Sequence, residues 1–242
     1  MIKTVNLTKK FGEKIAVNNL NLQINKGELF SLLGVNGAGK STTIKMLTTL
    51  TLPTSGEILI NDKNIYANLN EIKSKMNISP QETAIAPNLT VKENLLFIAS
   101  VYDVKNKEEK VNSLIKQFSF TDYTDKKAKT LSGGFKRRLS IAMALVNDPE
   151  ILFLDEPTLG LDVIARRELW KIIKNLKGKT TVLLTTHYME EAEALSDRVA
   201  IIANGKLKFI GTPSEIIEIS GEKTFEEAFI KLATENNYEK SI

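Results

Sequence analysis

The stretch GVNGAGKST at residues 34–42 decides the fold expected for this chain. It matches the pattern G-x-x-x-x-G-K-[ST], whose glycines let backbone N–H groups turn inward around phosphate oxygens. The flanking segments fit as well, because the apolar run ELFSLL ends at this loop and TTIKML continues from it with helical spacing. A buried strand, a phosphate-binding loop and a helix therefore follow one another. This order predicts a nucleotide site within an α/β domain.

All residues of this loop are candidates for binding a nucleotide and its metal ion. Lys40 is expected to pair with the β- and γ-phosphates, and the Ser41 hydroxyl to ligate Mg²⁺. A glycine-rich turn with a chance lysine is the alternative, which the strand, loop and helix together disfavour. The candidates are Gly34, Val35, Asn36, Gly37, Ala38, Gly39, Lys40, Ser41 and Thr42.

The segments around the loop predict a P-loop NTPase core with a parallel sheet. Residues 151–155, 181–187 and 197–205 are apolar strands separated by helical segments, the order typical of parallel sheets. Residues 2–7 and 15–24 alternate as strands, and residues 56–65 indicate a strand pair, so we expect an N-terminal antiparallel β subdomain. The helix after the loop should run through Leu50, until Pro53 and the Ser55-Gly56 turn end it.

Residues 87–131 predict an α-helical lobe inserted into this core. Thr90 and Glu93 form a capping-box pattern, and two apolar stretches of helical period follow it. The tail, from residue 222 to 235, predicts one amphipathic helix. We therefore expect a single domain with a catalytic core over 1–86 and 132–220, a helical lobe over 87–131 and a C-terminal helix over 221–242.

Two carboxylates and a histidine follow apolar strands of the expected sheet. Asp155 ends ILFLD and is a candidate magnesium ligand, and Glu156 is a candidate for orienting a water molecule. The chain has one histidine, His187, which follows TVLLTT and would donate a hydrogen bond to a γ-phosphate or to the attacking water. Solvated carboxylates and a structural histidine are the alternatives. Parallel strands bring their C-terminal ends to one crevice, which favours a shared site.

A second stretch, TLSGGFKRRLS at residues 130–140, has the composition of another phosphate site. Ser132 is a good helix N-cap, and three basic residues follow the glycines. A helix N-terminus attracts anions, so a phosphate would fit there. An N-cap with nothing bound is the alternative.

Composition excludes several classes of protein. The 33 basic and 29 acidic residues give a net charge of +4 with interleaved signs, so no nucleic-acid partner is expected. The absence of cysteine excludes disulfides and thiolate metal sites and suits a reducing cytoplasm. No apolar run approaches the length of about 20 residues that crosses a bilayer. We expect a soluble chain that meets a membrane only through a partner.

The order of these motifs resembles the nucleotide-binding subunit of ABC transporters, over residues 1 to about 213. The resemblance rests on GVNGAGKST, NISPQE, LSGGF, ILFLDEP, LGLD and TTHYMEEAE. It implies ATP and Mg²⁺ as cofactors, and two cassettes that pack head to tail. Each ATP would then lie between one chain's phosphate loop and the other chain's LSGGF, which would use Ser132, Gly133 and Gly134 on the partner's γ-phosphate.

The resemblance also assigns roles to three further residues. Gln81 would be a ligand of magnesium and water that senses the membrane half of the transporter. Phe11 would stack on adenine, and Asp162 would cross the interface between the two cassettes. A polar loop residue, a core aromatic and a helix N-cap are the respective alternatives. The family usually has glutamine where this chain has Phe135, which puts in doubt any hydrogen bond made from that position.

The expected function is an ATP-hydrolysing subunit that energises a membrane ABC transporter, with an exporter of drugs, antibiotics or ions as the closest match. The expected partners are a second ATPase chain, in a homodimer, and an integral-membrane permease. The chain would then lie on the cytoplasmic face of the membrane. The alternative is an ABC ATPase that acts on ribosomes or DNA, but those usually carry two cassettes or a long coiled-coil insertion. A scaffold without turnover is disfavoured by Lys40, Asp155, Glu156 and His187 together.

Overall fold

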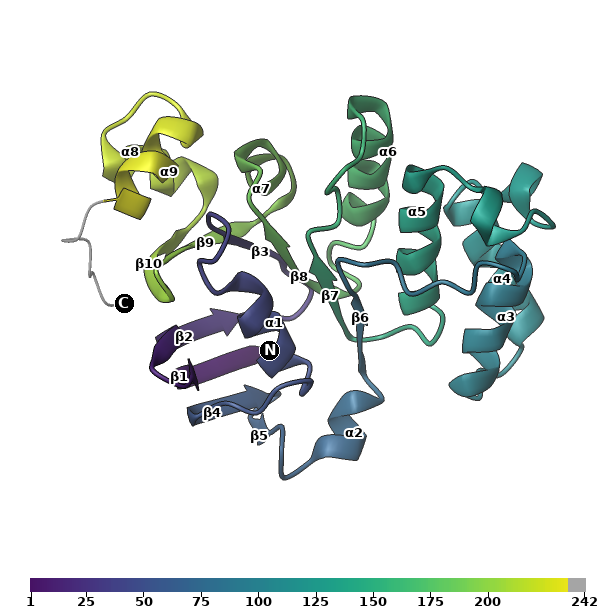
Figure 1. The fold of residues 1–242 in the computed structure, drawn as a ribbon, viewed down its shortest axis with the longest axis horizontal. Helices are drawn as coiled ribbons and strands as arrows, with labels where there is room; N and C mark the ends of the chain where they lie inside the picture. Colours follow the sequence, from purple (N-terminus) through teal and green to yellow (C-terminus); the bar gives the residue numbers. More distant parts are fainter. Residues whose placement is uncertain (235–242) are drawn as a thin grey trace.

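A computed structural model describes residues 1–234 of the chain (Figure 1). Its centre is a six-stranded sheet in the order β10-β9-β3-β8-β7-β6. All neighbours in it are parallel except β9 and β10, which form an antiparallel pair. The strands are β3 (Leu29–Leu33), β6 (Met76–Ser79), β7 (Ile151–Asp155), β8 (Thr181–Thr186), β9 (Arg198–Ala203) and β10 (Lys206–Gly211). The parallel sheet predicted from the apolar strands is confirmed.

A second, antiparallel sheet has the order β2-β1-β4-β5. Its strands are β1 (Ile2–Phe11), β2 (Lys14–Ile24), β4 (Ser55–Ile60) and β5 (Lys63–Asn64). This sheet lies beside α1 (Lys40–Leu47), as Figure 1 shows. The N-terminal antiparallel β subdomain is therefore confirmed as part of the fold.

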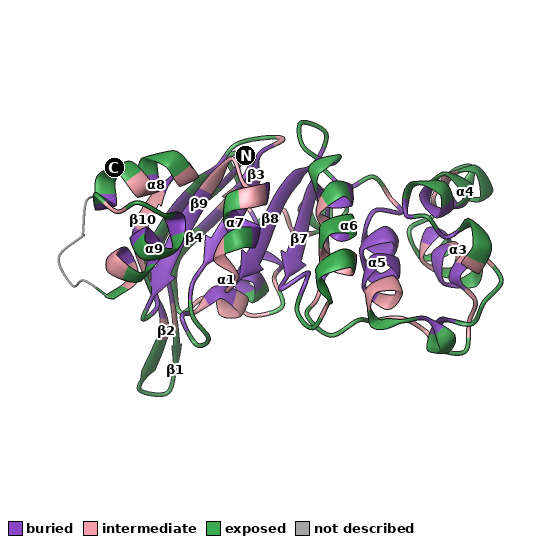
Figure 2. Ribbon diagram, turned by 90° about the horizontal axis from the view of Figure 1, so that it is seen from above, coloured by how far each residue is buried: buried purple, intermediate pink, exposed green. Residues whose placement is uncertain are grey.

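Side chains alternate between the two faces of the central sheet. Phe153 of β7 and Leu183 of β8 lie in one core with α1 and the antiparallel sheet. Leu152 and Leu154 lie in the other core, with α5 (Gly133–Ala144) and α6 (Val163–Lys174). The elements α7 (Met189–Leu195), α8 (Pro213–Ser220) and α9 (Phe225–Thr234) supply most of a third core beside β9. Figure 2 shows the central strands buried and the outer helix faces exposed.

Residues 87–131 contain α3 (Val91–Val101), α4 (Lys107–Gln117) and two short 3₁₀ turns, η1 (Thr121–Tyr123) and η2 (Ala128–Thr130). Thr90 and Glu93 form the predicted capping box at the start of α3. The apolar core of this helical lobe is continuous with that of the sheet, since Val91 and Leu95 belong to the same cluster as Leu152. The lobe is thus fixed against α5. The boundaries at 86/87 and 131/132 stay predictions.

A buried asparagine closes the loop that leads into the lobe. The Asn94 side chain is fully buried, accepts from the Ala86 N–H at 2.8 Å, and donates to the carbonyl oxygens of Ala86, Leu89 and Thr90. Asn94→Ala would leave the Ala86 N–H without its partner and remove one donor from each of the three carbonyl groups, at a cost of about 1–3 kcal/mol in the free energy of unfolding. Urea denaturation measures that cost. The exposed Asn112→Ala on α4 is the control, with an expected change within about 0.5 kcal/mol.

The helix after the phosphate-binding loop ends earlier than predicted. It stops at Leu47, and Thr49 adopts a left-handed conformation with φ 61°. That turn carries Leu50 to the surface, where it is 66 % exposed, so its prediction as a helical core residue is wrong. The helix predicted for the tail is confirmed over Phe225–Thr234, and residues 235–242 of the expected C-terminal segment lie outside the described residues.

Two strands and two short helices were not predicted from the pattern. β6 has only four residues and lies at the edge of the sheet, while β10 pairs with β9 through a turn at Asn204 and Gly205. Both turn residues have positive φ, as a two-residue hairpin turn requires. The Asn-Gly pair was therefore a usable signal. The missed helices are α2 (Leu69–Lys73) and α8.

Candidate functional site

The candidate site lies where β3, β7 and β8 end. These strands are parallel, so their C-terminal ends meet at one edge of the sheet. The loop over residues 34–42 leaves β3 there and turns into α1 at Gly39, whose φ is 107°. A Cβ at Gly39 would lie 2.5 Å from the Ala16 carbonyl oxygen, so only glycine fits this turn. The first N–H groups of α1 are thereby directed at the site.

Lys40 is buried at the start of α1. Its Nζ donates to the carbonyl oxygens of Gly34 at 2.8 Å and Val35 at 3.3 Å, within its own loop. The same nitrogen forms an ion pair with Oε1 of Glu156 at 3.2 Å. The structure thus brings the loop lysine and the strand-end glutamate into contact, although they are distant in sequence.

Asp155 connects the strand ends to α1. Its Oδ1 accepts from the Ser41 hydroxyl at 3.2 Å and from the Thr185 hydroxyl at 2.6 Å. The Thr185 hydroxyl in turn accepts from the Glu156 N–H at 3.0 Å. Thr185 was not among the predicted residues. Its signal was a hydroxyl residue that, together with Thr186, ends an apolar strand two positions before His187.

Glu156 is the central carboxylate of the site. Its backbone has φ 49°, the left-handed region that non-glycine residues rarely adopt, which turns it out of the strand direction. Its side chain is 7 % exposed and contacts Lys40 through Oε1 and His187 Nδ1 through Oε2, the latter at 2.8 Å. A carboxylate held between a cation and an imidazole is suited to polarising a water molecule.

The donor set at Ser41 and Asp155 fits a magnesium ion. The hydroxyl and the carboxylate converge to 3.2 Å, and Mg²⁺ in nucleotide sites is held by one or two such oxygens together with substrate phosphates. Within residues 1–234 there is no cluster of three or more His, Asp or Glu side chains placed to hold a metal by itself.

Four groups of predicted site residues lie outside this hydrogen-bonded network. Phe11 ends β1, is 54 % exposed and has the Lys9 Nζ 5.0 Å from its ring centroid. Gln81 is exposed in the loop after β6, and Asp162 caps α6 by accepting from two N–H groups at 2.9 Å. The last group is Ser132, Gly133 and Gly134 at the start of α5, where Ser132 is the predicted N-cap.

Two of the three basic residues after the glycines, Arg137 and Arg138, are engaged in contacts within the chain. The side chain of Arg137 is buried against backbone carbonyls, and Arg138 is buried and forms an ion pair with Glu168. Phe135, which stands where the family usually has glutamine, packs on the Tyr123 ring at 4.3 Å between centroids. It thereby attaches the start of α5 to the helical lobe.

A further buried acid lies next to the site. Glu191 of α7 is fully buried and accepts from Trp170 Nε1 of α6 at 3.1 Å. Burial raises the pKa of Glu191, against the opposing effect of hydrogen bonds from Thr186, Thr158 and Trp170. Before the structure, only its place in the segment that follows His187 pointed to this residue.

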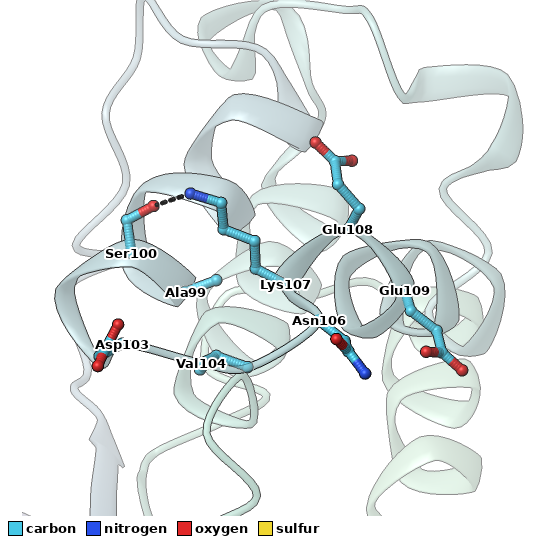
Figure 3. A pocket seen from close by; sticks show the side chains of 8 residues that line it. All are labelled: Ala99, Ser100, Asp103, Val104, Asn106, Lys107, Glu108 and Glu109. Atoms are coloured by element: carbon cyan, nitrogen blue, oxygen red, sulfur yellow. Dashed lines mark hydrogen bonds between the residues drawn. The ribbon is translucent and has the colours of Figure 1, made fainter.

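A pocket lies away from this site, between the end of α3 and the start of α4 (Figure 3). Lys107 crosses it and donates to the Ser100 hydroxyl at 3.2 Å. Its lining residues are Ala99, Ser100, Asp103, Val104, Asn106, Lys107, Glu108 and Glu109. None of these is a predicted site residue.

The central sheet, the glycine-rich loop and the carboxylates at the strand ends define a P-loop NTPase domain. The model of the ABC transporter family matches residues 17–159, which include the loop, Gln81, Ser132 and both carboxylates. The chain belongs to the ABC transporter family and is an ABC ATPase domain.

Individual relatives agree with this assignment. The Nod factor export ATP-binding protein I of Burkholderia lata is 42 % identical over 217 residues, which are 88 % of this chain and 71 % of that protein. The probable multidrug ABC transporter ATP-binding protein YbhF of Escherichia coli is 39 % identical over 240 residues, 96 % of this chain. The chain spans 41 % of the length of that second relative.

The fold is also similar to those of solved ATP-binding cassettes. A dimeric ATP-binding cassette, described as a post-hydrolysis state bound to ADP and Pi, has a TM-score of 0.78 and 29 % identity. The match covers 88 % of this chain and 98 % of that one. Within residues 1–234, no helix has the length and apolar character needed to span a membrane.

Proposed function

We propose that this chain binds and hydrolyses MgATP and so energises a membrane transporter. The observation that carries the proposal is the network at the strand ends, in which Lys40, Glu156 and His187 are joined and Asp155 meets Ser41. Lys40 pairs with the β- and γ-phosphates, and the loop N–H groups surround them. Ser41, Asp155 and Gln81 would hold Mg²⁺, which would supply positive charge to neutralise the phosphates.

Hydrolysis follows from the position of Glu156. Its carboxylate orients and polarises the attacking water, and His187 holds that carboxylate through Nδ1 and donates toward the γ-phosphate or the water. Phosphoryl transfer needs mainly positioning and charge stabilisation, which this buried group of polar side chains supplies. Phe11, exposed at the end of β1, offers a ring face to the adenine.

We propose that the complete site forms between two copies of the chain. Ser132 and Gly133 are exposed at the start of α5, which packs on the sheet face opposite to α1. They are thus presented to another molecule rather than to the chain's own loop. The segment around Asp162 also exposes apolar side chains, with Val163 62 % and Ile164 72 % exposed. Exposed apolar groups of this kind are typical of interaction surfaces.

The membrane role is proposed from the family and the relatives. One relative is named as a Nod factor export protein and another as a multidrug transporter protein, so an exporter is the favoured class. A permease partner would place the chain at the cytoplasmic face of the membrane. The two long helices of the lobe hold 11 residues each, which is far shorter than the coiled coil expected of an ABC ATPase acting on DNA.

Ser132→Arg tests the two-chain site. A bulky cation at the start of α5 should block closure of two chains around ATP and remove the helix N-terminus from the γ-phosphate. We expect the rate of hydrolysis to fall by about 10²- to 10³-fold, the usual loss for one preorganised contact. A phosphate-release assay over a range of chain concentrations measures it.

The control for lost capping is Thr212→Arg. Thr212 caps α8 with the same kind of side-chain hydrogen bond but is not among the site residues, so this variant should hydrolyse ATP normally. Hydrolysis by Ser132→Arg at the rate of Thr212→Arg would contradict the two-chain site.

A further inference from the structure

Arg137 joins two chain segments through hydrogen bonds, which its place in a basic stretch of the sequence does not indicate. Its side chain is buried, and its guanidinium donates to four backbone carbonyl groups. Nη2 donates to Asp155 at 2.7 Å, and Nε donates to Pro157 at 2.9 Å. Nη1 donates to Pro80 and, at 3.3 Å, to Gln81.

These four carbonyl groups come from two segments that the sheet no longer joins. The last paired residues of β6 and β7 are Ser79 and Leu154. Immediately beyond this pair, Pro80 and Gln81 continue one chain segment and Asp155 to Pro157 continue the other. Arg137 reaches from α5 and binds both segments at the point where they leave the ladder. It therefore replaces the sheet hydrogen bonds as the connection between them.

Only a guanidinium can make this connection. Its planar fork carries five N–H donors in fixed directions, whereas a lysine ammonium is a single flexible nitrogen. Burial lowers the pKa of Arg137 to about 10, and the carboxylates of Asp155, Glu191 and Glu156 act in the opposite direction. The group is thus a cation at neutral pH, and the buried site carboxylates compensate its charge.

We propose that Arg137 is a positioning residue that sets Gln81 relative to Asp155 and Glu156. This rests on the proposed ATP hydrolysis, in which Gln81 and Asp155 share one metal ion. The guanidinium holds the backbone of Gln81 and the backbone of Asp155 at once, so it fixes the separation between their side chains. It also joins this pair to α5, whose first residues form the second phosphate contact.

A double-mutant cycle tests the proposal through the turnover number. Arg137→Lys keeps the buried charge but loses the fork, and we expect kcat to fall about 10- to 100-fold, since a misplacement near 1 Å costs this much. The ATP affinity of the single chain should stay within about threefold, because the loop around Lys40 is unaffected. In a Gln81→Ala background the same Arg137→Lys change should cost less than about threefold, since coupled residues are not additive.

The matched control is Arg198→Lys. Arg198 is likewise an arginine that joins two segments, through a carboxylate and a carbonyl, with Nε 2.7 Å from Glu28 Oε1 and Nη2 2.7 Å from the Gln23 oxygen. It lies at the opposite end of the sheet, where β9 begins beside Phe30 of β3. This variant should lower the thermal midpoint and leave kcat unchanged.

Two results would overturn the proposal. One is an equal loss of kcat from Arg137→Lys in the two backgrounds, and the other is a kcat within twofold of the unaltered chain. Arg137→Gln, which removes the buried charge, is the second variant if the first does not fold. If the chain folds with neither lysine nor glutamine at position 137, the proposal fails as well, because Arg137 is then a structural support only. Absence of hydrolysis by the unaltered chain would instead contradict the proposed function.

Discussion

Lys40→Ala is expected to abolish ATP hydrolysis and to weaken nucleotide binding markedly. Lys40 is the buried cation of the phosphate-binding loop, and loss of one such contact typically costs about 10²- to 10³-fold in rate. The change has a second effect here, because Glu156 loses its ion-pair partner at 3.2 Å and is left as a buried carboxylate. Phosphate release and calorimetric titration with ATP measure the two losses.

Lys45→Ala is the matched control for this variant. Lys45 lies on the same helix but on its exposed side, so its loss should change neither turnover nor affinity. Turnover by Lys40→Ala close to that of Lys45→Ala at saturating ATP would remove the loop from the mechanism.

Glu156→Gln should separate binding from hydrolysis. The amide keeps the shape of the side chain but cannot accept a proton from water, so ATP binds and turnover falls to background. Because the closed state then persists, two chains should stay together. Size-exclusion chromatography with MgATP is expected to show a dimer for this variant.

Glu150→Gln provides the same substitution at the other end of β7. Glu150 is exposed and directly precedes the strand, so this chain should hydrolyse ATP normally. If Glu156→Gln hydrolyses ATP as fast as Glu150→Gln, another residue activates the water.

The core of the fold was predictable because its signals are local. The loop at 34–42 fits one motif, and the apolar runs before Asp155 and His187 have the length and character of buried parallel strands. Parallel strands end at one edge, so the contact of Lys40, Glu156 and His187 follows from the topology. We could therefore predict that these residues lie close together from the parallel arrangement of their strands alone.

The remaining features depend on contacts between distant segments. Arg137 meets Pro80 and Asp155, and no spacing in the sequence indicates which of three adjacent basic residues binds these two segments. The early end of α1 depends on Thr49 in a left-handed conformation, without the glycine that usually marks such an end. In both cases tertiary packing selects a conformation that the local pattern leaves open.

We propose above that Ser132 serves the nucleotide of a partner chain. The measurement that tests it most directly is the affinity of single chains for ATP, taken below the concentration at which they associate. We expect Ser132→Arg to bind ATP within about threefold of the unaltered chain, since the loop at Lys40 keeps its contacts, and Lys40→Ala to bind far more weakly. If Ser132→Arg loses affinity as completely as Lys40→Ala does, the motif serves its own chain's nucleotide, and the two-chain site is contradicted.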